Sequence, residues 1–180
     1  MTLKLLFYIA VLLIAIIGYR YSATASSPLK IGDDAPNFAL NDAQGKTHYL
    51  SDYLDKYLII YFYPKDNTPG CTKEACNFRD EFRQLEKLDA KIVGISLDDS
   101  QSHSAFAKQY HLPFPLLTDI NGVVSNSYNA LYNFYVIKIA KRRTFLINTE
   151  GKIVKIYRDI DVSSHSQKVI DDLKLIQNKQ

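Results

Sequence analysis

The stretch YLIIYFYPKDNTPGCTKEAC, residues 57–76, decides the fold of this chain. It opens with seven apolar or aromatic residues, a pattern typical of a strand buried on both faces of a sheet. Pro64 ends that run, and the turn-rich residues 65–70 follow it. From Cys71 to Leu88 apolar residues recur at steps of three and four, which predicts an amphipathic helix over this range with Cys71 in its first turn.

The same alternation of strand and helix continues along the chain. We expect further strands at 91–97, 114–117, 145–148 and 153–157, a turn between 37–40 and 46–49, and helices at 101–110, 123–128 and 164–176. The pattern indicates one α/β domain over residues 26–180, built as a central mixed β-sheet flanked by helices.

Cys71 and Cys76 are the two cysteines of the chain. The N-terminal end of a helix favours a thiolate, because unpaired backbone N–H groups there point at the sulfur. Pro69 and Gly70 fix the turn before the helix, and Thr68 can offer its hydroxyl to a polar ligand. These residues predict a pocket for an oxygen-containing ligand beside Cys71.

The spacing of the two cysteines argues against the structural disulfide that an exported protein would ordinarily form. On an ideal helix the Cα atoms of positions 71 and 76 are about 8–9 Å apart, whereas a disulfide needs roughly 4.4–6.8 Å. We therefore expect the helix to unravel locally before the sulfurs join. The alternative is a helix break before Cys76, although residues 73–75 contain no helix breaker.

The segment at 61–76 resembles the active-site segment of the bacterioferritin comigratory protein, or Q-type, peroxiredoxins. It contains their pattern of Pro64, three residues, Thr68, two residues and Cys71, with the second cysteine at Cys76. The resemblance extends over about residues 31–175, with further matching segments at 32–38, 112–119 and 142–147. It implies a thioredoxin-like fold with the N-terminal extension of peroxiredoxins, and a thiol peroxidase activity.

The resemblance also implies roles for individual residues. Cys71 would attack the peroxide, Thr68 would orient it, and Pro64 would shield the pocket. The family places an arginine three residues before a strand phenylalanine, which selects Arg142 as the residue that stabilises the thiolate and the transition state. Strand alternation puts the neighbouring Arg143 on the opposite face, where we expect a solvated side chain.

The reaction implied by the resemblance uses no cofactor and no metal. Hydrogen peroxide or an organic hydroperoxide would convert Cys71 to a sulfenic acid, and Cys76 would condense with it to a disulfide. Thioredoxin or a thioredoxin-like dithiol would then reduce that disulfide. We expect the enzyme to act as a monomer.

Two other thiol functions fit the spacing less well. A membrane-associated thiol-disulfide oxidoreductase on the same fold is the main alternative, but it would ordinarily carry Cys-x-x-Cys. A membrane-anchored copper chaperone would need three residues between its cysteines and a downstream histidine. Four residues separate Cys71 from Cys76.

Residues 1–25 have a different composition from the rest. Lys4 and Arg20 flank an unbroken apolar run at 5–17. Thirteen apolar residues fall short of the roughly 18–20 that span a bilayer comfortably, and residues 23–25 offer the small-x-small pattern that a signal peptidase recognises.

We expect cleavage that leaves Ser26 as the first residue, with an uncleaved membrane anchor as the alternative and a buried N-terminal helix as a weaker one. The protein would then be exported to the bacterial envelope or tethered to the inner membrane, facing the periplasm. Without Lys4 and Arg20 the formal net charge of +3 falls to +1. This charge gives no support to a nucleic-acid surface.

Residues 129–137 are more apolar and aromatic than the corresponding segment expected from the family resemblance. We expect them to pack in the core, with a membrane-facing or partner-binding surface as alternatives.

The four histidines have no ligand-like spacing in the sequence. We expect them at the surface or at helix caps rather than on a metal: His48, His103, His111 and His165.

Overall fold

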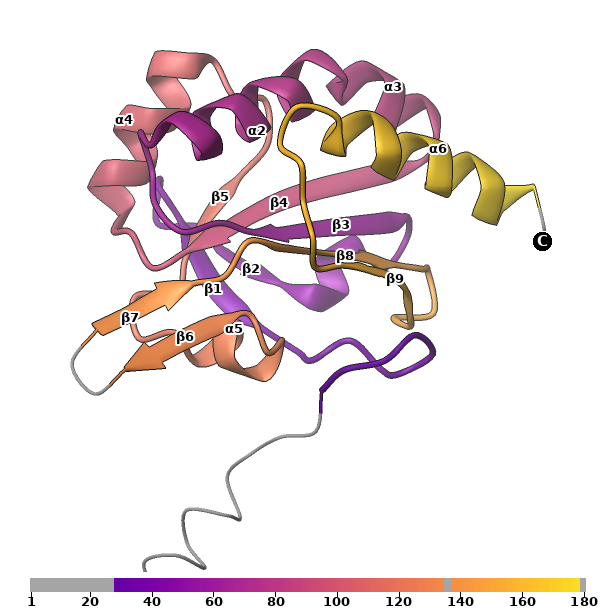
Figure 1. Ribbon diagram of the computed structural model, residues 1–180, viewed down its shortest axis with the longest axis horizontal. Coiled ribbons are helices and arrows are strands. Elements are labelled where there is room, and N and C mark those ends of the chain that lie inside the picture. Colours follow the sequence, from indigo (N-terminus) through magenta and orange to yellow (C-terminus); the bar gives the residue numbers. More distant parts are fainter. Residues whose placement is uncertain (1–27, 135–136, 179–180) are drawn as a thin grey trace, which may run out of the picture.

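The computed structural model describes residues 28–134 and 137–178 (Figure 1). A seven-stranded mixed sheet with the order β2-β1-β5-β4-β3-β8-β9 forms its centre. Its strands are β1 (Ala39–Asp42), β2 (Thr47–Tyr49), β3 (Tyr57–Phe62), β4 (Ala90–Ser96), β5 (Leu116–Thr118), β8 (Arg143–Ile147) and β9 (Ile153–Tyr157). A separate hairpin pairs β6 (Leu131–Phe134) with β7 (Ile137–Ala140).

The helices are the short 3-10 helix η1 (Leu50–Tyr53) and the α-helices α2 (Pro69–Asp80), α3 (Phe82–Lys87), α4 (Ser100–Tyr110), α5 (Val123–Ser127) and α6 (His165–Gln177). Helices α2, α3, α4 and α6 cover one face of the sheet, and η1 and α5 lie toward the other (Figure 1). The predicted mixed sheet flanked by helices is therefore confirmed.

Strand β3 runs between β4, to which it is parallel, and β8, to which it is antiparallel. All six of its residues are buried, because successive side chains enter opposite layers of the core. Ile59 and Tyr61 pack under α2 and α6, whereas Ile60 and Phe62 pack in the layer of η1 and α5. The strand thereby fixes the start of the loop that leads into α2.

Three expectations from the sequence are wrong. The helix from Cys71 is divided, since α2 ends at Asp80 and α3 starts at Phe82. The described part of the segment 129–137, residues 129–134 and Ile137, does not pack as core, because Ala130 is its one buried residue and most of the side chains after it are exposed.

The third wrong expectation concerns the histidines. His48, His103 and His165 are buried, because each finds a side-chain partner that offsets the loss of water. His111 does sit at a cap, at the C-terminal end of α4 with a left-handed backbone of φ 52°. The expectations for residues 1–25 lie outside the described residues, among which no helix is long and apolar enough to cross a bilayer.

Candidate active site

Cys71 lies in the first turn of α2, as the third residue of the helix, and is only 1% exposed. Thr68 occupies the N-cap position with an extended backbone, and Pro69 follows as the first helical residue. Proline suits this position because the first N–H of a helix has no intrahelical partner. The other free N–H groups of this first turn lie at the positive end of the helix dipole, which favours an anion at Cys71.

The positively charged guanidinium of Arg142 lies next to the sulfur of Cys71. Its Nη2 donates a hydrogen bond to Cys71 Sγ over 3.2 Å. Strand β8 starts at the next residue, and the pairing of Arg143 with Phe62 at the end of β3 holds this part of the chain beside the loop before α2. The Arg143 side chain does not share the contact with Cys71: it is half-buried, and Arg158 and Tyr132 are the charged or ionisable groups that influence it.

Glu74 is a site residue that the sequence analysis missed. Its carboxyl is buried and pairs with Arg142 Nη1, so a single guanidinium contacts both Glu74 and Cys71. Burial raises the pKa of Glu74 to about 7, and the nearby Arg142 only partly offsets that rise. Although burial opposes its charge, Glu74 and Cys71 together raise the pKa of Arg142.

The sequence did carry a signal for Glu74. Residues 71, 74, 75 and 78 occupy one face of a helix, and all four are buried in α2. A charged residue at an inner position of that pattern needs a buried partner. Neither the second carboxyl oxygen of Glu74 nor the buried hydroxyl of Tyr61 has a hydrogen-bond partner among the described residues.

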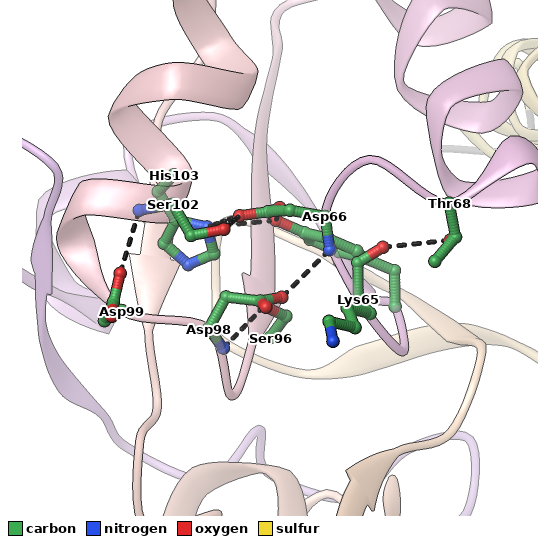
Figure 2. Close-up of polar contacts among 9 residues, drawn as sticks. Lys65, Asp66, Thr68, Ser96, Asp98, Asp99, Ser102 and His103 are labelled. Carbon is green, nitrogen blue, oxygen red and sulfur yellow. Dashed lines mark hydrogen bonds and ion pairs between the residues drawn. The ribbon is translucent and has the colours of Figure 1, made fainter.

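Thr68 is held by its own loop. Its hydroxyl donates a hydrogen bond to the Lys65 carbonyl oxygen over 3.0 Å (Figure 2). Because the hydroxyl proton is used in this way, the lone pairs of the oxygen are left to accept a hydrogen bond from a ligand. Pro64 is half-buried at the point where the chain leaves β3.

Asp66 fastens the same loop to α4. Its carboxylate accepts hydrogen bonds from Tyr63 Oη over 2.7 Å and Ser102 Oγ over 2.8 Å, and it pairs with His103 Nδ1 over 2.8 Å (Figure 2). Its backbone N–H donates to Asp98 over 3.0 Å. Burial alone would raise the pKa of Asp66, but its contacts with His103, Tyr63 and Ser102 lower it. The loop that presents Thr68 is therefore anchored by a buried carboxylate.

Cys76 lies further along α2, is half-buried, and is not bonded to Cys71. The helix runs without interruption from Pro69 to Asp80, so the alternative of a helix break before Cys76 is wrong. The side chains of Lys73 and Asn77 fasten this part of α2 to the loop before α6. Lys73 Nζ donates to Ser163 Oγ over 2.9 Å, and Asn77 Nδ2 donates to the Val162 carbonyl over 2.8 Å.

The arrangement combines a buried thiol, a helix N-terminus and a guanidinium. Such a site can hold a thiolate and, next to it, the negative charge that develops on an oxygen under attack. Among residues 28–134 and 137–178 no group of side chains is arranged to hold a metal ion.

Comparisons with known proteins point to the same chemistry. Residues 31–156 match the AhpC/TSA family. The chain is 38% identical over 161 residues to peroxiredoxin Bcp of Bacillus subtilis, covering 84% of this chain and 99% of that protein. It is 43% identical over 150 residues to a putative peroxiredoxin bcp of Helicobacter pylori strain J99, covering 81% and 98%.

Solved structures are similar over the same region. Peroxidoxin BcpB of Mycobacterium tuberculosis superposes with a TM-score of 0.79 at 33% identity, over 82% of this chain and 98% of that chain. A PrxQ mutant of Xylella fastidiosa superposes with a TM-score of 0.78 at 31% identity, over 84% and 99%. The fold expected from the sequence is therefore confirmed.

Proposed function

We propose that Cys71 attacks the peroxide, because the chain belongs to the AhpC/TSA family. Within that family it is a thiol peroxidase of the Bcp/Q-type peroxiredoxins, with a thioredoxin-like fold. The observation that carries this assignment is the contact of Arg142 with Cys71 Sγ at the N-terminus of α2. Cys76 lies beside the Arg79 guanidinium, but it is only half-buried and lies beyond the first turn of the helix.

In the first step the Cys71 thiolate attacks the terminal oxygen of a hydroperoxide. The S–O bond forms as the O–O bond breaks, and the departing oxygen takes up a proton and leaves as water or an alcohol. Cys71 is oxidised by two electrons to a sulfenic acid. Hydrogen peroxide and organic hydroperoxides are both substrates in this proposal.

Three side chains support that step. Arg142 stabilises the thiolate and the negative charge on the departing oxygen, since one of its N–H groups already reaches Cys71 Sγ. Thr68 accepts a hydrogen bond from the peroxide O–H, because its own proton is engaged by Lys65. Pro64 shields the pocket from water at the end of β3.

Cys76 resolves the sulfenic acid. Its thiolate attacks Cys71 Sγ, a disulfide forms, and the sulfenic oxygen leaves as water. The two cysteines are five positions apart on an intact helix, so the first turns of α2 must unravel before the sulfurs meet. Thioredoxin or a thioredoxin-like dithiol then supplies two electrons and returns both thiols.

Peroxide consumption by the purified protein tests the proposal, with dithiothreitol as the reductant. We expect turnover by the wild type and none by Cys71→Ser. Cys76→Ser should reduce one equivalent of peroxide rapidly but lose turnover with thioredoxin. A Cys71→Ser protein as active as the wild type would refute the assignment of the attacking residue.

The apolar run at 5–17 leads us to propose that the enzyme is exported to the bacterial envelope or tethered to the inner membrane, facing the periplasm. The match to the family starts only at residue 31, downstream of this run. The mass of the mature protein distinguishes cleavage before Ser26 from a retained anchor. Recovery of the intact chain from the soluble cytoplasmic fraction would contradict both locations.

A further inference from the structure

The hairpin of β6 and β7 has one face made of four large apolar side chains. Tyr132 pairs with Ile139, and Phe134 pairs with Ile137. Residues directly opposite each other in an antiparallel pair lie on the same face, and so do residues two apart on one strand. We call this set the hairpin face; its members are 51% (Tyr132), 66% (Phe134), 58% (Ile137) and 43% (Ile139) exposed.

The other face of the hairpin is turned toward the domain. Leu131 packs so closely over Gly122 that a Cβ there would lie 3.0 Å from its side chain. Lys138 Nζ donates to the Asn121 carbonyl over 3.1 Å, and Ala140 is buried. The hairpin is thus held with its apolar face toward solvent, the reverse of the usual arrangement of a half-buried sheet. Exposed apolar clusters of this kind mark interaction sites.

Cations border the hairpin face. Lys141 Nζ lies 4.7 Å from the centre of the Tyr132 ring, whose plane stacks with that of Phe134. Burial and the nearby Arg158 lower the pKa of Arg143, two residues after Lys141. Within the described part of the chain, neither Lys141 nor Arg158 forms an ion pair with a carboxylate. The border of the hairpin face therefore carries two cations that have no carboxylate partner among the described residues.

The N-terminal segment enters the domain on this side. Leu29 N donates to Asn129 Oδ1 over 2.9 Å, directly before the hairpin, and Arg158 Nη2 donates to the Leu29 carbonyl over 3.0 Å. In the form of the protein that keeps the apolar run at 5–17 as an anchor, the run ends 12 residues before Leu29, a reach of at most about 40 Å. In Figure 1 the start of the described chain and the hairpin lie on the side of the sheet away from α2 and α6.

We propose that the hairpin face docks on an anionic lipid bilayer. Its four apolar side chains enter the interfacial region, and Lys141 and Arg158 meet the lipid phosphates. A second copy of the chain fits less well, because four half-exposed side chains offer on the order of 300–400 Å², against about 800 Å² per partner in a stable dimer. The proposal rests on the membrane tether proposed above but is independent of the peroxidase reaction, and α2 with Cys71 stays on the opposite side of the sheet.

Tryptophan fluorescence tests the docking, since the chain contains no tryptophan. The full-length Phe134→Trp protein is reconstituted into vesicles of phosphatidylcholine and phosphatidylglycerol. We expect its emission to shift to shorter wavelength and to be quenched several-fold by brominated acyl chains. The matched control is Leu175→Trp, at a position on α6 that is 58% exposed and remote from the hairpin; its emission should remain that of a solvated indole.

Equal, solvent-like emission from the two proteins would overturn the proposal, even if the N-terminal segment holds both on the vesicles. A blue shift that appears without vesicles and grows with protein concentration would also overturn it, in favour of a second copy. Ile137→Trp, directly opposite Phe134, should repeat the result if Phe134→Trp fails to fold. Adding Lys141→Gln and Arg158→Gln should reduce quenching in anionic vesicles to the level found in zwitterionic ones; unchanged quenching would contradict the role of the cations.

Discussion

Arg142 donates a hydrogen bond to Cys71 Sγ across 3.2 Å, although the two residues are 71 positions apart in the chain. The same guanidinium also pairs with the buried carboxyl of Glu74, so its position is held from two sides. The reactivity of the thiol therefore depends on a contact between the start of β8 and the first turns of α2.

Replacing Arg142 by alanine should slow the reaction of Cys71 with hydrogen peroxide by about 100-fold, because a preorganised donor to the reacting atoms is lost. Stopped-flow measurement of the second-order rate constant checks this. Arg143→Ala is the matched control and should change the rate little, since Arg143 has no contact with Cys71. Equal losses in the two variants would contradict the assignment.

The Glu74→Gln substitution should change the pH profile of peroxide reduction. In the wild type Glu74 has a pKa of about 7, so above that pH a carboxylate competes with Cys71 for Arg142. Glutamine cannot ionise, and we expect the ratio of the rate at pH 8 to the rate at pH 6 to be higher in the variant. Superimposable profiles for the two proteins would show that Glu74 does not titrate beside the thiol.

The sequence predicted the strand, loop and helix around Cys71 because that segment carries its own local signals: a buried apolar run, a proline, a turn and a helical period. The choice of Arg142 came from the family resemblance, and alternation along a strand, a local property, placed Arg143 on the opposite face. Glu74 was not identified as a site residue from the sequence, because a charged residue on a helix is ordinarily assigned to the solvent side. Its partner, Arg142, becomes a neighbour only through the pairing of β3 with β8.

The burial of the histidines and the exposure of the hairpin were also not predicted, because both depend on residues that are distant in the sequence. Asp66 and His103 meet across 37 positions, and nothing in the local pattern of either residue indicates the other. The aromatic run after Asn129 resembles core in composition, whereas the structure turns half of it outward because Leu131 and Ala140 take the inner positions. Composition indicates how apolar a segment is, but tertiary contacts decide which face is buried.

Removing the Asn77 side chain should speed disulfide formation after Cys71 is oxidised. Asn77 fastens α2 to the loop before α6 through the Val162 carbonyl, with a longer contact of 3.4 Å to the Ser163 carbonyl. Loss of one such hydrogen bond costs about 1 kcal/mol, so Asn77→Ala should raise the population of the unravelled helix, and with it the rate, about 5-fold. Gln167→Ala, which removes a contact with Asp171 on the exposed side of α6, is the control. The rate of amide hydrogen exchange at residues 71–78 should rise together with the rate of disulfide formation. If neither rate changes in Asn77→Ala, the helix does not need to unravel.

His165 should make the fold less stable in acid. Burial, with Lys168 and Arg142 nearby, lowers its pKa to about 4, so the unfolded chain binds a proton near pH 6.5 that the folded chain does not. Stability is therefore lost as the pH falls from 6.5 toward 4, by as much as about 3 kcal/mol.

The free energy of unfolding in urea, measured at pH 6.5 and pH 4.5, checks this. Between these two pH values it should fall less in His165→Gln than in the wild type. Glu74 acts in the opposite direction, since its raised pKa favours the folded state as the pH falls from 7 to 4.5. The comparison is therefore made between proteins that both retain Glu74. An equal loss in the two proteins would contradict the role of His165.

The most direct test of the catalytic assignment is to trap the first oxidised species. The Cys76→Ser protein is mixed with one equivalent of hydrogen peroxide and a reagent that labels sulfenic acids, and the labelled peptide is identified by mass spectrometry. We expect one label per chain, at Cys71, and a Cys71–Cys76 disulfide in the wild type treated in the same way. Oxidation of the wild type at Cys76 with Cys71 left as a free thiol would contradict the account.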